Sequence, residues 1–220
     1  MQQHTNRRRL DSLTSAVALA LIATASASAA IVATDPGAIQ IAPPASAQFG
    51  ALAGPPIYCW DEQQNVAVPP SGIPVNTLGS GIWTGPGVNN ATYFGVGVDS
   101  HMIHFDATSG VSNANAGVTF SSSIVAVIYE NNLLAATDGF LGSLTTTYEP
   151  ATFLRSSGAA LFQNWFQVTG NHIKFSLWAS TPGLPNRMMQ LRVLTESAIP
   201  APGALALLGA AGAIGARRRR

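Results

Sequence analysis

A β-hairpin in the last third of the chain constrains the fold more than any other stretch. The runs Trp165 to Thr169 and His172 to Trp178 are rich in β-branched and aromatic residues, and they flank the dipeptide Gly170-Asn171. A two-residue loop of this kind requires a primed turn, in which glycine readily takes a positive φ. The chain is therefore predicted to contain at least one tight antiparallel strand pair.

The loop length also predicts which hairpin residues face a core. It pairs Phe166 with Phe175, and alternate residues of a strand then lie on the same face. The apolar face consists of Phe166, Val168, Ile173, Phe175 and Leu177, and the polar face carries Gln167, Lys174 and Ser176. This pattern predicts a sheet with one buried side.

The rest of the domain repeats this kind of pattern. Short apolar runs separated by Gly, Pro, Asn and Ser predict an all-β fold. Further strands are expected at Asn65 to Val68, Ile82 to Thr84, Thr92 to Val98 with Phe94, Val96 and Val98 on one face, Met102 to Asp106, Gly117 to Ser121, and Met188 to Thr195. Ile124 to Tyr129 is apolar on both faces, which predicts a central strand covered on one side by a helical turn at Asn132 to Ala136.

We therefore expect a two-sheet antiparallel β-sandwich of jelly-roll-like topology. An N-terminal signal helix and a short hydrophobic C-terminal helix would flank it.

The N-terminus has the three parts of a secretory signal. Arg7 to Arg9 precede the apolar run Ala16 to Ala25, and small residues follow at Ala27-Ser28-Ala29. Residues 1–29 are thus predicted to be a signal peptide. A second small-residue site, Ala45-Ser46-Ala47, leaves open a longer signal that ends at residue 47. Twin-arginine export is the other pathway that the adjacent arginines leave open.

Composition predicts the remaining boundaries. Residues 30–56 contain much Ala, Pro and Gly and few large apolar side chains, so they are expected to form a leader or linker. Residues 57–196 are expected to form the sandwich domain, and residues 197–220 a C-terminal sorting or membrane-anchor segment.

Charge and cysteine content narrow the classes of function. Between Gln48 and Ile199 there are four basic and eight acidic residues, which predicts no basic surface for nucleic acid. Cys59 is the single cysteine, so no intramolecular disulfide can form. Beside Trp60 we expect it to be a buried apolar residue, with a reactive thiol or an intermolecular bridge as the alternatives.

The C-terminus has three parts in a fixed order. Pro200, Ala201, Pro202 and Gly203 form a break, Gly203 to Ala216 contains no charged residue, and Arg217, Arg218, Arg219 and Arg220 end the chain. An apolar run with a basic end indicates a membrane-stop segment with the arginines on the cytoplasmic side. The run is shorter than the roughly 20 residues that cross a bilayer, so it is expected to hold the membrane only weakly.

This tail resembles the PEP-CTERM sorting signal of bacterial exported proteins, with Ala201 in place of the family's glutamate. The resemblance implies recognition and cleavage by a membrane-bound exosortase-like enzyme. An uncut anchor is the alternative. The stretches DSHMIHFD, GVTFSSSIVAVIYE, LLAATDGFLG and LRVLT also look like exported β-sandwich proteins with this tail, which implies a fold and a location but no catalytic residue.

Asp99, His101, His104 and Asp106 form the densest group of possible metal ligands. Strand alternation puts Asp99 and His101 on one face and His104 and Asp106 on the other, so the four cannot converge. We expect a polar strand end that faces water, and no cofactor. His104 and Asp106 remain the candidate metal ligands, and Ca²⁺ is the ion that carboxylate oxygen favours.

Hydrolytic chemistry has little support in the sequence. Ser100 and His101 are adjacent on a strand and point apart, and no Gly-x-Ser-x-Gly is present. A carboxylate pair for glycoside hydrolysis is equally unsupported.

Trp165 and Trp178 are the remaining candidate binding residues, because exposed tryptophans in sandwich domains stack on sugars. The alternative is that they cover hydrophobic surface. The expected function is therefore that of an exported, non-enzymatic surface or extracellular-matrix protein. A carbohydrate-binding module with a polysaccharide partner is the alternative, and a small secreted hydrolase is the third reading.

Overall fold

The structure is a computed structural model of the 220-residue chain. It describes residues 29–52, 54, 56–84, 90–106, 112–150, 155, 164–179 and 188–197. The strands are β1 (Ile31–Thr34), β2 (Ala38–Gln40), β3 (Ile57–Asp61), β4 (Val66–Ala67), β5 (Ile73–Val75), β6 (Thr77–Leu78), β7 (Gly81–Thr84), β8 (Ala91–Tyr93), β9 (Gly97–Asp106), β10 (Ser112–Phe120), β11 (Ile124–Ile128), β12 (Trp165–Thr169), β13 (His172–Ala179) and β14 (Met188–Glu196), and the helix is α1 (Asn131–Leu141).

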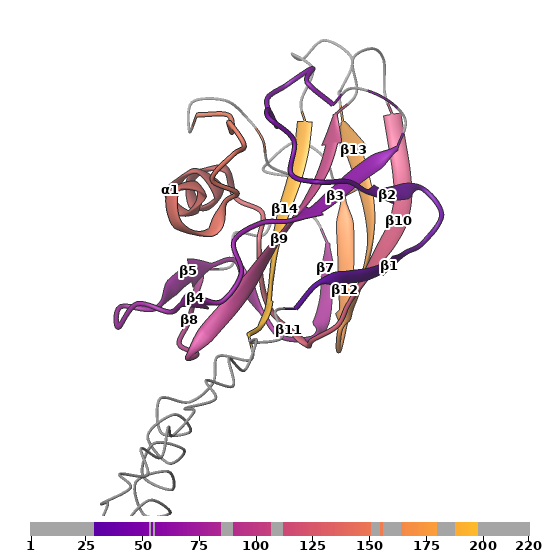
Figure 1. Ribbon diagram of the computed structural model, residues 1–220. Coiled ribbons are helices and arrows are strands. Elements are labelled where there is room, and N and C mark those ends of the chain that lie inside the picture. Colours follow the sequence, from indigo (N-terminus) through magenta and orange to yellow (C-terminus); the bar gives the residue numbers. More distant parts are fainter. Residues whose placement is uncertain are drawn as a thin grey trace, which may run out of the picture.

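The described residues form two main sheets in a sandwich-like arrangement (Figure 1). The first, sheet A, has the strand order β1-β10-β13-β12-β7 and is antiparallel throughout. The second, sheet B, has the order β2-β3-β9-β14-β11-β6, with β4 paired to the start of β9. Sheet B is mixed rather than antiparallel, because β2 and β3 run parallel.

The predicted hairpin is confirmed residue by residue. β12 pairs with β13 in the register that the two-residue loop requires, with Phe166 opposite Phe175. Gly170 takes φ 61°, the left-handed conformation that a side chain disfavours. Phe166, Val168, Ile173, Phe175 and Leu177 are all buried in the core between the sheets. The short-range rules of turn length and alternation suffice here because every contact they use is local.

β11 is confirmed as a central strand covered on both sides. It lies between β14 and β6. Val127 belongs to the core between the sheets, whereas Ala126 and Ile128 belong to a second buried cluster that also contains Leu134 and Leu141 of α1. The helix therefore covers the outer face of sheet B, and it is longer than the single turn that the sequence predicted.

Residues 30–56 are not the linker that their composition indicates. β1 pairs with β10, and β2 pairs with β3, so this segment contributes one strand to each sheet. Its small side chains fit closely, with Ile31, Ala38 and Ala47 buried. Backbone hydrogen bonds and small apolar contacts thus order a segment that lacks large hydrophobic residues, and the fold begins well before Ile57.

The strand predicted from Thr92 to Val98 is also wrong. β8 ends at Tyr93 and β9 begins at Gly97. Phe94 and Val96 are 72 % and 76 % exposed, and only Val98 enters the core. The strand is interrupted around Gly95, where an added Cβ would clash with the Tyr93 hydroxyl.

The signal peptide, the sorting motif at Pro200 to Gly203 and the arginines at 217–220 lie outside the described residues. Within the described ranges, no helix has the length and apolar character needed to cross a membrane.

The place of β1 predicts the signal cleavage site. Removal of residues up to Ala47 deletes β1 and β2, takes Ile31 and Ala47 out of the core, and leaves the carboxylate of Asp61 without the N–H of Ile31. We expect a chain that begins at Gln48 to be less stable to urea than one that begins at Ala30 by at least about 3 kcal/mol.

Mass analysis of the exported protein should then place its first residue before Ile31. Equal urea midpoints for the two chains, or a mature protein that starts at Gln48, would show that β1 and β2 are dispensable.

Candidate functional site

The four polar residues of β9 are buried rather than exposed to water. Asp99, His101, His104 and Asp106 all have zero exposed fraction. Their alternation is as predicted, because His101 contacts Phe120 in the core between the sheets while His104 contacts Trp60 on the outer face of sheet B. The expectation of a water-facing strand end fails because β9 is an interior strand whose two faces are both covered.

On the inner face, His101 links an acid and a hydroxyl. Its Nδ1 lies 2.7 Å from Asp61 Oδ1, and its Nε2 lies 3.0 Å from Thr195 Oγ1. The order of an acid, a histidine and a hydroxyl is that of a hydrolase triad. However, His101 and Thr195 are fully buried, so no substrate can reach the hydroxyl. Asp61 also accepts the N–H of Ile31 at 3.1 Å. This series of hydrogen bonds therefore connects the two sheets.

Asp99 holds the N-terminal segment in a similar way. Its two carboxylate oxygens accept the backbone N–H groups of Ala29 and Asn65. The neighbouring Ser100 donates to Glu62 Oε2 at 2.7 Å and does not meet His101. The predicted separation of Ser100 from His101 is thus confirmed. Asp99 and Glu62 both make structural hydrogen bonds.

A larger ionic network lies between sheet B and α1. Arg192 of β14 donates from Nε and Nη2 to the two oxygens of Glu62, at 2.7 and 3.0 Å. The same guanidinium reaches Asp138 Oδ1 at 2.9 Å, Thr137 Oγ1 at 2.7 Å and the carbonyl of Leu134 at 3.2 Å. All five of its N–H donors are therefore satisfied. The pKa of Arg192 is above its ordinary value, because the opposing effect of burial is outweighed by the carboxylates of Glu62 and Asp138.

Arg155 extends the network toward the loop that contains Ala47. It binds Asp138 with both Nη atoms and donates from Nε to Gln190 Oε1 at 2.6 Å. Tyr148 lies against both arginines, with its ring centre 5.5 Å from the guanidinium carbon of Arg155 and 5.6 Å from that of Arg192. Its hydroxyl donates to Glu62 at 2.6 Å, and burial together with that carboxylate raises the pKa of Tyr148.

His104 ends this network in a neutral form. Gln190 uses its oxygen for Arg155, so its Nε2 donates to His104 Nδ1 at 2.9 Å and to the Ala47 carbonyl at 3.1 Å. The proton of His104 therefore lies on Nε2, which has no hydrogen-bond partner among the residues that the structure describes. Burial, assisted by the charge of Arg155, lowers the pKa of His104 to about 3.

His104 and Asp106 do not form a metal site with other described residues. No group of three His, Cys, Asp or Glu side chains that could hold an ion occurs in the described part of the chain. Asp106 accepts the N–H of Gly50, and burial raises the pKa of its carboxyl despite that hydrogen bond. Cys59 is buried as predicted, and burial raises the pKa of its thiol to about 12.

Trp165 and Trp178 lie on the outer face of sheet A. Their strand neighbours Phe166 and Leu177 point into the core, so alternation turns both tryptophans away from it. Trp165 is opposite Ser176, two residues before Trp178, and both tryptophans are half-buried. Gln167 and Lys174 are exposed on the same face. The arrangement offers apolar rings beside hydrogen-bonding groups.

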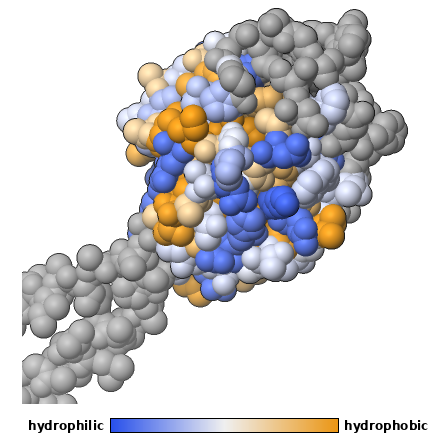
Figure 2. Space-filling model, turned by 90° about the vertical axis from the view of Figure 1, so that its right-hand side faces the viewer, coloured by the Kyte–Doolittle hydropathy of each residue, from blue (hydrophilic) through white to orange (hydrophobic). Residues whose placement is uncertain are grey.

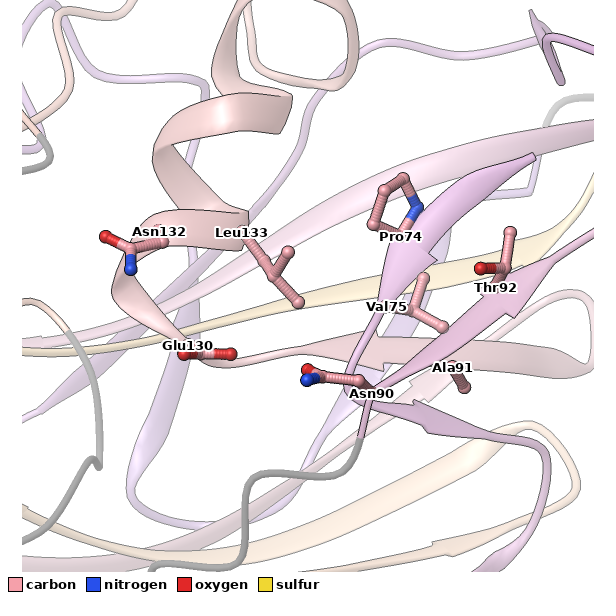
Figure 3. Close-up of a pocket in the computed structure, with 8 residues that line it drawn as sticks. All are labelled: Pro74, Val75, Asn90, Ala91, Thr92, Glu130, Asn132 and Leu133. Atoms are coloured by element: carbon pink, nitrogen blue, oxygen red, sulfur yellow. The ribbon is translucent and has the colours of Figure 1, made fainter. Parts of the chain in front are cut away.

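A shallow cleft of about 410 Å³ lies at the N-terminal end of α1, between the helix and the β5–β8 pair (Figure 3). Pro74, Val75, Ala91 and Leu133 form its apolar part, and Asn90, Thr92, Glu130 and Asn132 provide polar groups. Glu130 Oε2 accepts a hydrogen bond from Asn76 Nδ2 at 3.4 Å. The volume falls within the range of small-molecule sites.

The side of the molecule seen in Figure 2 has hydrophilic residues through its middle and hydrophobic residues in separated patches. Among the residues drawn in colour, this side shows no continuous apolar surface.

Comparison with known proteins gives no relative. No family model, no curated protein and no solved structure matched the chain.

The sequence interpretation missed Glu62, Asp138, Arg155 and Arg192 as a group. The available signal was Arg192, a lone cation within the apolar strand sequence LRVLT, because a strand of that kind is buried and a buried cation needs an acid. Which acid it finds was not predictable, since Glu62 lies 130 residues away.

The buried neutral His104 predicts a pH dependence of stability. Unfolded histidine has a pKa near 6.5, so between pH 6.5 and about 3 the unfolded chain binds a proton that the folded chain does not. The contribution of His104 to the free energy of unfolding is therefore fully present above pH 6.5. As the pH decreases below 6.5, this contribution is lost by about 1.4 kcal/mol per pH unit. We expect H104Q to lose less stability than the wild type between pH 7 and pH 5 in urea unfolding.

H172Q is the matched control, because His172 is partly exposed at the surface beside Asp35. An H104Q chain with the same pH slope as the wild type would show that His104 is solvated or protonated in the fold.

Proposed function

We propose that the chain is an exported, non-enzymatic β-sandwich protein of the cell surface or extracellular matrix, sorted through its C-terminal segment. The observation that carries this proposal is that the acidic, basic and histidine side chains of the described sets bind one another inside the domain. In the triad-like set Asp61–His101–Thr195 and in the ionic set Glu62–Arg192–Asp138, only Asp61 and Asp138 are partly exposed and the other members are buried. Both sets hold strands, helix and N-terminal segment together. Side chains with such partners stabilise the domain. The proposed function therefore depends on the exposed residues of the domain.

The two ends of the chain supply the location. Export rests on the basic, apolar and small-residue order of residues 1–29, and sorting rests on Pro200 to Gly203, the apolar run and the four terminal arginines. An exosortase-like membrane enzyme is the processing partner in this proposal. We also propose that the sandwich has a jelly-roll-like topology and that a signal helix and a short hydrophobic helix flank it at the two ends of the chain.

A carbohydrate-binding module is the second proposal, favoured by the placement of Trp165 and Trp178. Two half-buried indole rings on one sheet face, beside exposed Gln167 and Lys174, provide the stacking surface and the polar groups that a sugar ring needs. This reading also needs no catalytic residue. It differs from the first in requiring measurable affinity for a glycan.

The tail is tested by intact-mass analysis of the protein from its native host. We expect cleavage near Pro202, because the Ala- and Gly-rich run contributes little transfer energy and holds the membrane only transiently. A mature protein that still carries Arg220 would reduce the segment to a permanent anchor and remove sorting from the proposal.

The binding reading is tested with a glycan array. Trp178→Ala is expected to abolish any glycan binding, whereas Leu144→Ala, at an exposed apolar residue just after α1, should leave it unchanged. Absence of binding at millimolar sugar concentrations would remove the module. Turnover of a polysaccharide or ester substrate by the wild type would instead revive the hydrolase.

A further inference from the structure

Two of the most exposed apolar side chains of the described residues lie together at one end of the molecule. Phe94 and Val96 are 72 % and 76 % exposed, and they lie in the link between β8 and β9. Single exposed apolar residues are ordinary in proteins. A phenylalanine and a valine two positions apart, both turned outward, need a reason.

Their outward position is built into the backbone. Gly72 takes φ 75°, and a Cβ added there would lie 2.8 Å from the Phe94 ring, so the ring rests directly on that turn. The carbonyl of Val96 accepts the N–H of Val68 at 3.2 Å. Both side chains are thus presented from an ordered frame that joins the ends of β4, β5, β8 and β9.

The C-terminal segment leaves the domain beside these residues. The N–H of Ser197 lies 3.5 Å from the carbonyl of Gly97, and its Oγ donates to Asn65 Oδ1 at 2.8 Å. Ala198 to Pro202 then separate Ser197 from the apolar run that begins at Gly203. At no more than about 3.6 Å per residue, the six steps from Ser197 to Gly203 span at most roughly 22 Å. Any bilayer that holds the apolar run therefore lies within reach of Phe94 and Val96.

The same end of the sandwich contains turns without charged residues. The turn at Ser121 to Ser123 lies beside the end of β14, because the N–H of Glu196 donates to the Ser123 carbonyl at 2.9 Å. Gly170-Asn171 lies next to it, because Ile124 donates to the Gly170 carbonyl at 2.9 Å. Gly79-Ser80 is adjacent in turn, through the Gly170 N–H and Ser80 Oγ at 3.2 Å.

We propose that Phe94 and Val96 insert into the interfacial layer of the phospholipid bilayer while the C-terminal segment is membrane-bound, and so hold the domain against the membrane before release. This inference rests on the membrane stage of the proposed function. Two side chains bury far less than the roughly 800 Å² per partner of a stable protein interface. They suffice for a weak lipid contact, because the tail already keeps the domain at a high local concentration near the surface.

The experiment places a reporter beside Phe94 in protein that is expressed in full, processed at its N-terminus by the host and still carries its tail. Ser71 is exposed and precedes Gly72, so an S71C chain can carry an environment-sensitive fluorophore there. Cys59 is fully buried and does not compete for the label. The protein is reconstituted into phosphatidylcholine vesicles that contain a nitroxide-labelled lipid, and flotation and quenching are measured on the same sample.

Quenching of the label by the nitroxide lipid is the expected result. Phe94→Ser combined with Val96→Ser should reduce the membrane-contacting fraction roughly tenfold, because burial of a phenylalanine and a valine accounts for that factor or more. Leu144→Ser, at a residue that is 84 % exposed just after α1, is the matched control and should retain quenching. Near-ultraviolet circular dichroism should be unchanged in all variants, since these side chains are outside the core.

The outcomes separate the inference from the function on which it rests. Flotation of the wild type without quenching, or quenching that the double variant retains, overturns the insertion of Phe94 and Val96 and leaves the membrane stage intact. Quenching that appears only at high protein density shows a second copy as the occupant and overturns the inference. Failure of the wild type to float refutes the membrane stage itself, and the inference falls with it.

Discussion

The ion pair between Arg192 and Glu62 is the interaction on which the outer half of the domain depends. Both side chains are almost completely shielded from water, and taking either charge out of water alone would cost several kcal/mol. The cost is offset because every N–H of Arg192 has an acceptor and because Tyr148, Asp138 and Thr137 complete the group. Glu62 follows β3, Arg192 lies in β14 and Thr137 and Asp138 lie in α1, so the pair fixes the helix onto the sheet.

Such a network explains why an interior strand of this protein carries so many polar residues. Asp99, Ser100, His101 and His104 each meet a defined partner from another segment. A hydrophobic strand in the same place would lack these partner-specific hydrogen bonds. Buried acids and histidines with unique partners specify one alignment of β3, β9 and β14.

Local features of the fold were predictable from the sequence, and partners far apart in the chain were not. The hairpin register follows from a two-residue loop, and the role of β11 follows from a run that is apolar on both faces. The alternation of His101 and His104 was also correct, yet their burial was not foreseen, because the covering residues come from β3, β10 and the segment around Ala47. Composition misled at residues 30–56, where the strand pairing of β1 and β2 and the hydrogen bond from the Ile31 N–H to Asp61 replace large side chains as the ordering force.

The position of β1 determines when the domain can complete its fold. The N–H of Ala30 meets Ser121 Oγ, a residue 91 positions later in the chain. A polypeptide that crosses a membrane from its N-terminus delivers β1 first and its partner β10 only after about half the chain has followed. Contacts of such long sequence separation form slowly, since a long loop must close before they stabilise anything. On the export route proposed above, the first strand to emerge therefore has no partner until β10 has also crossed.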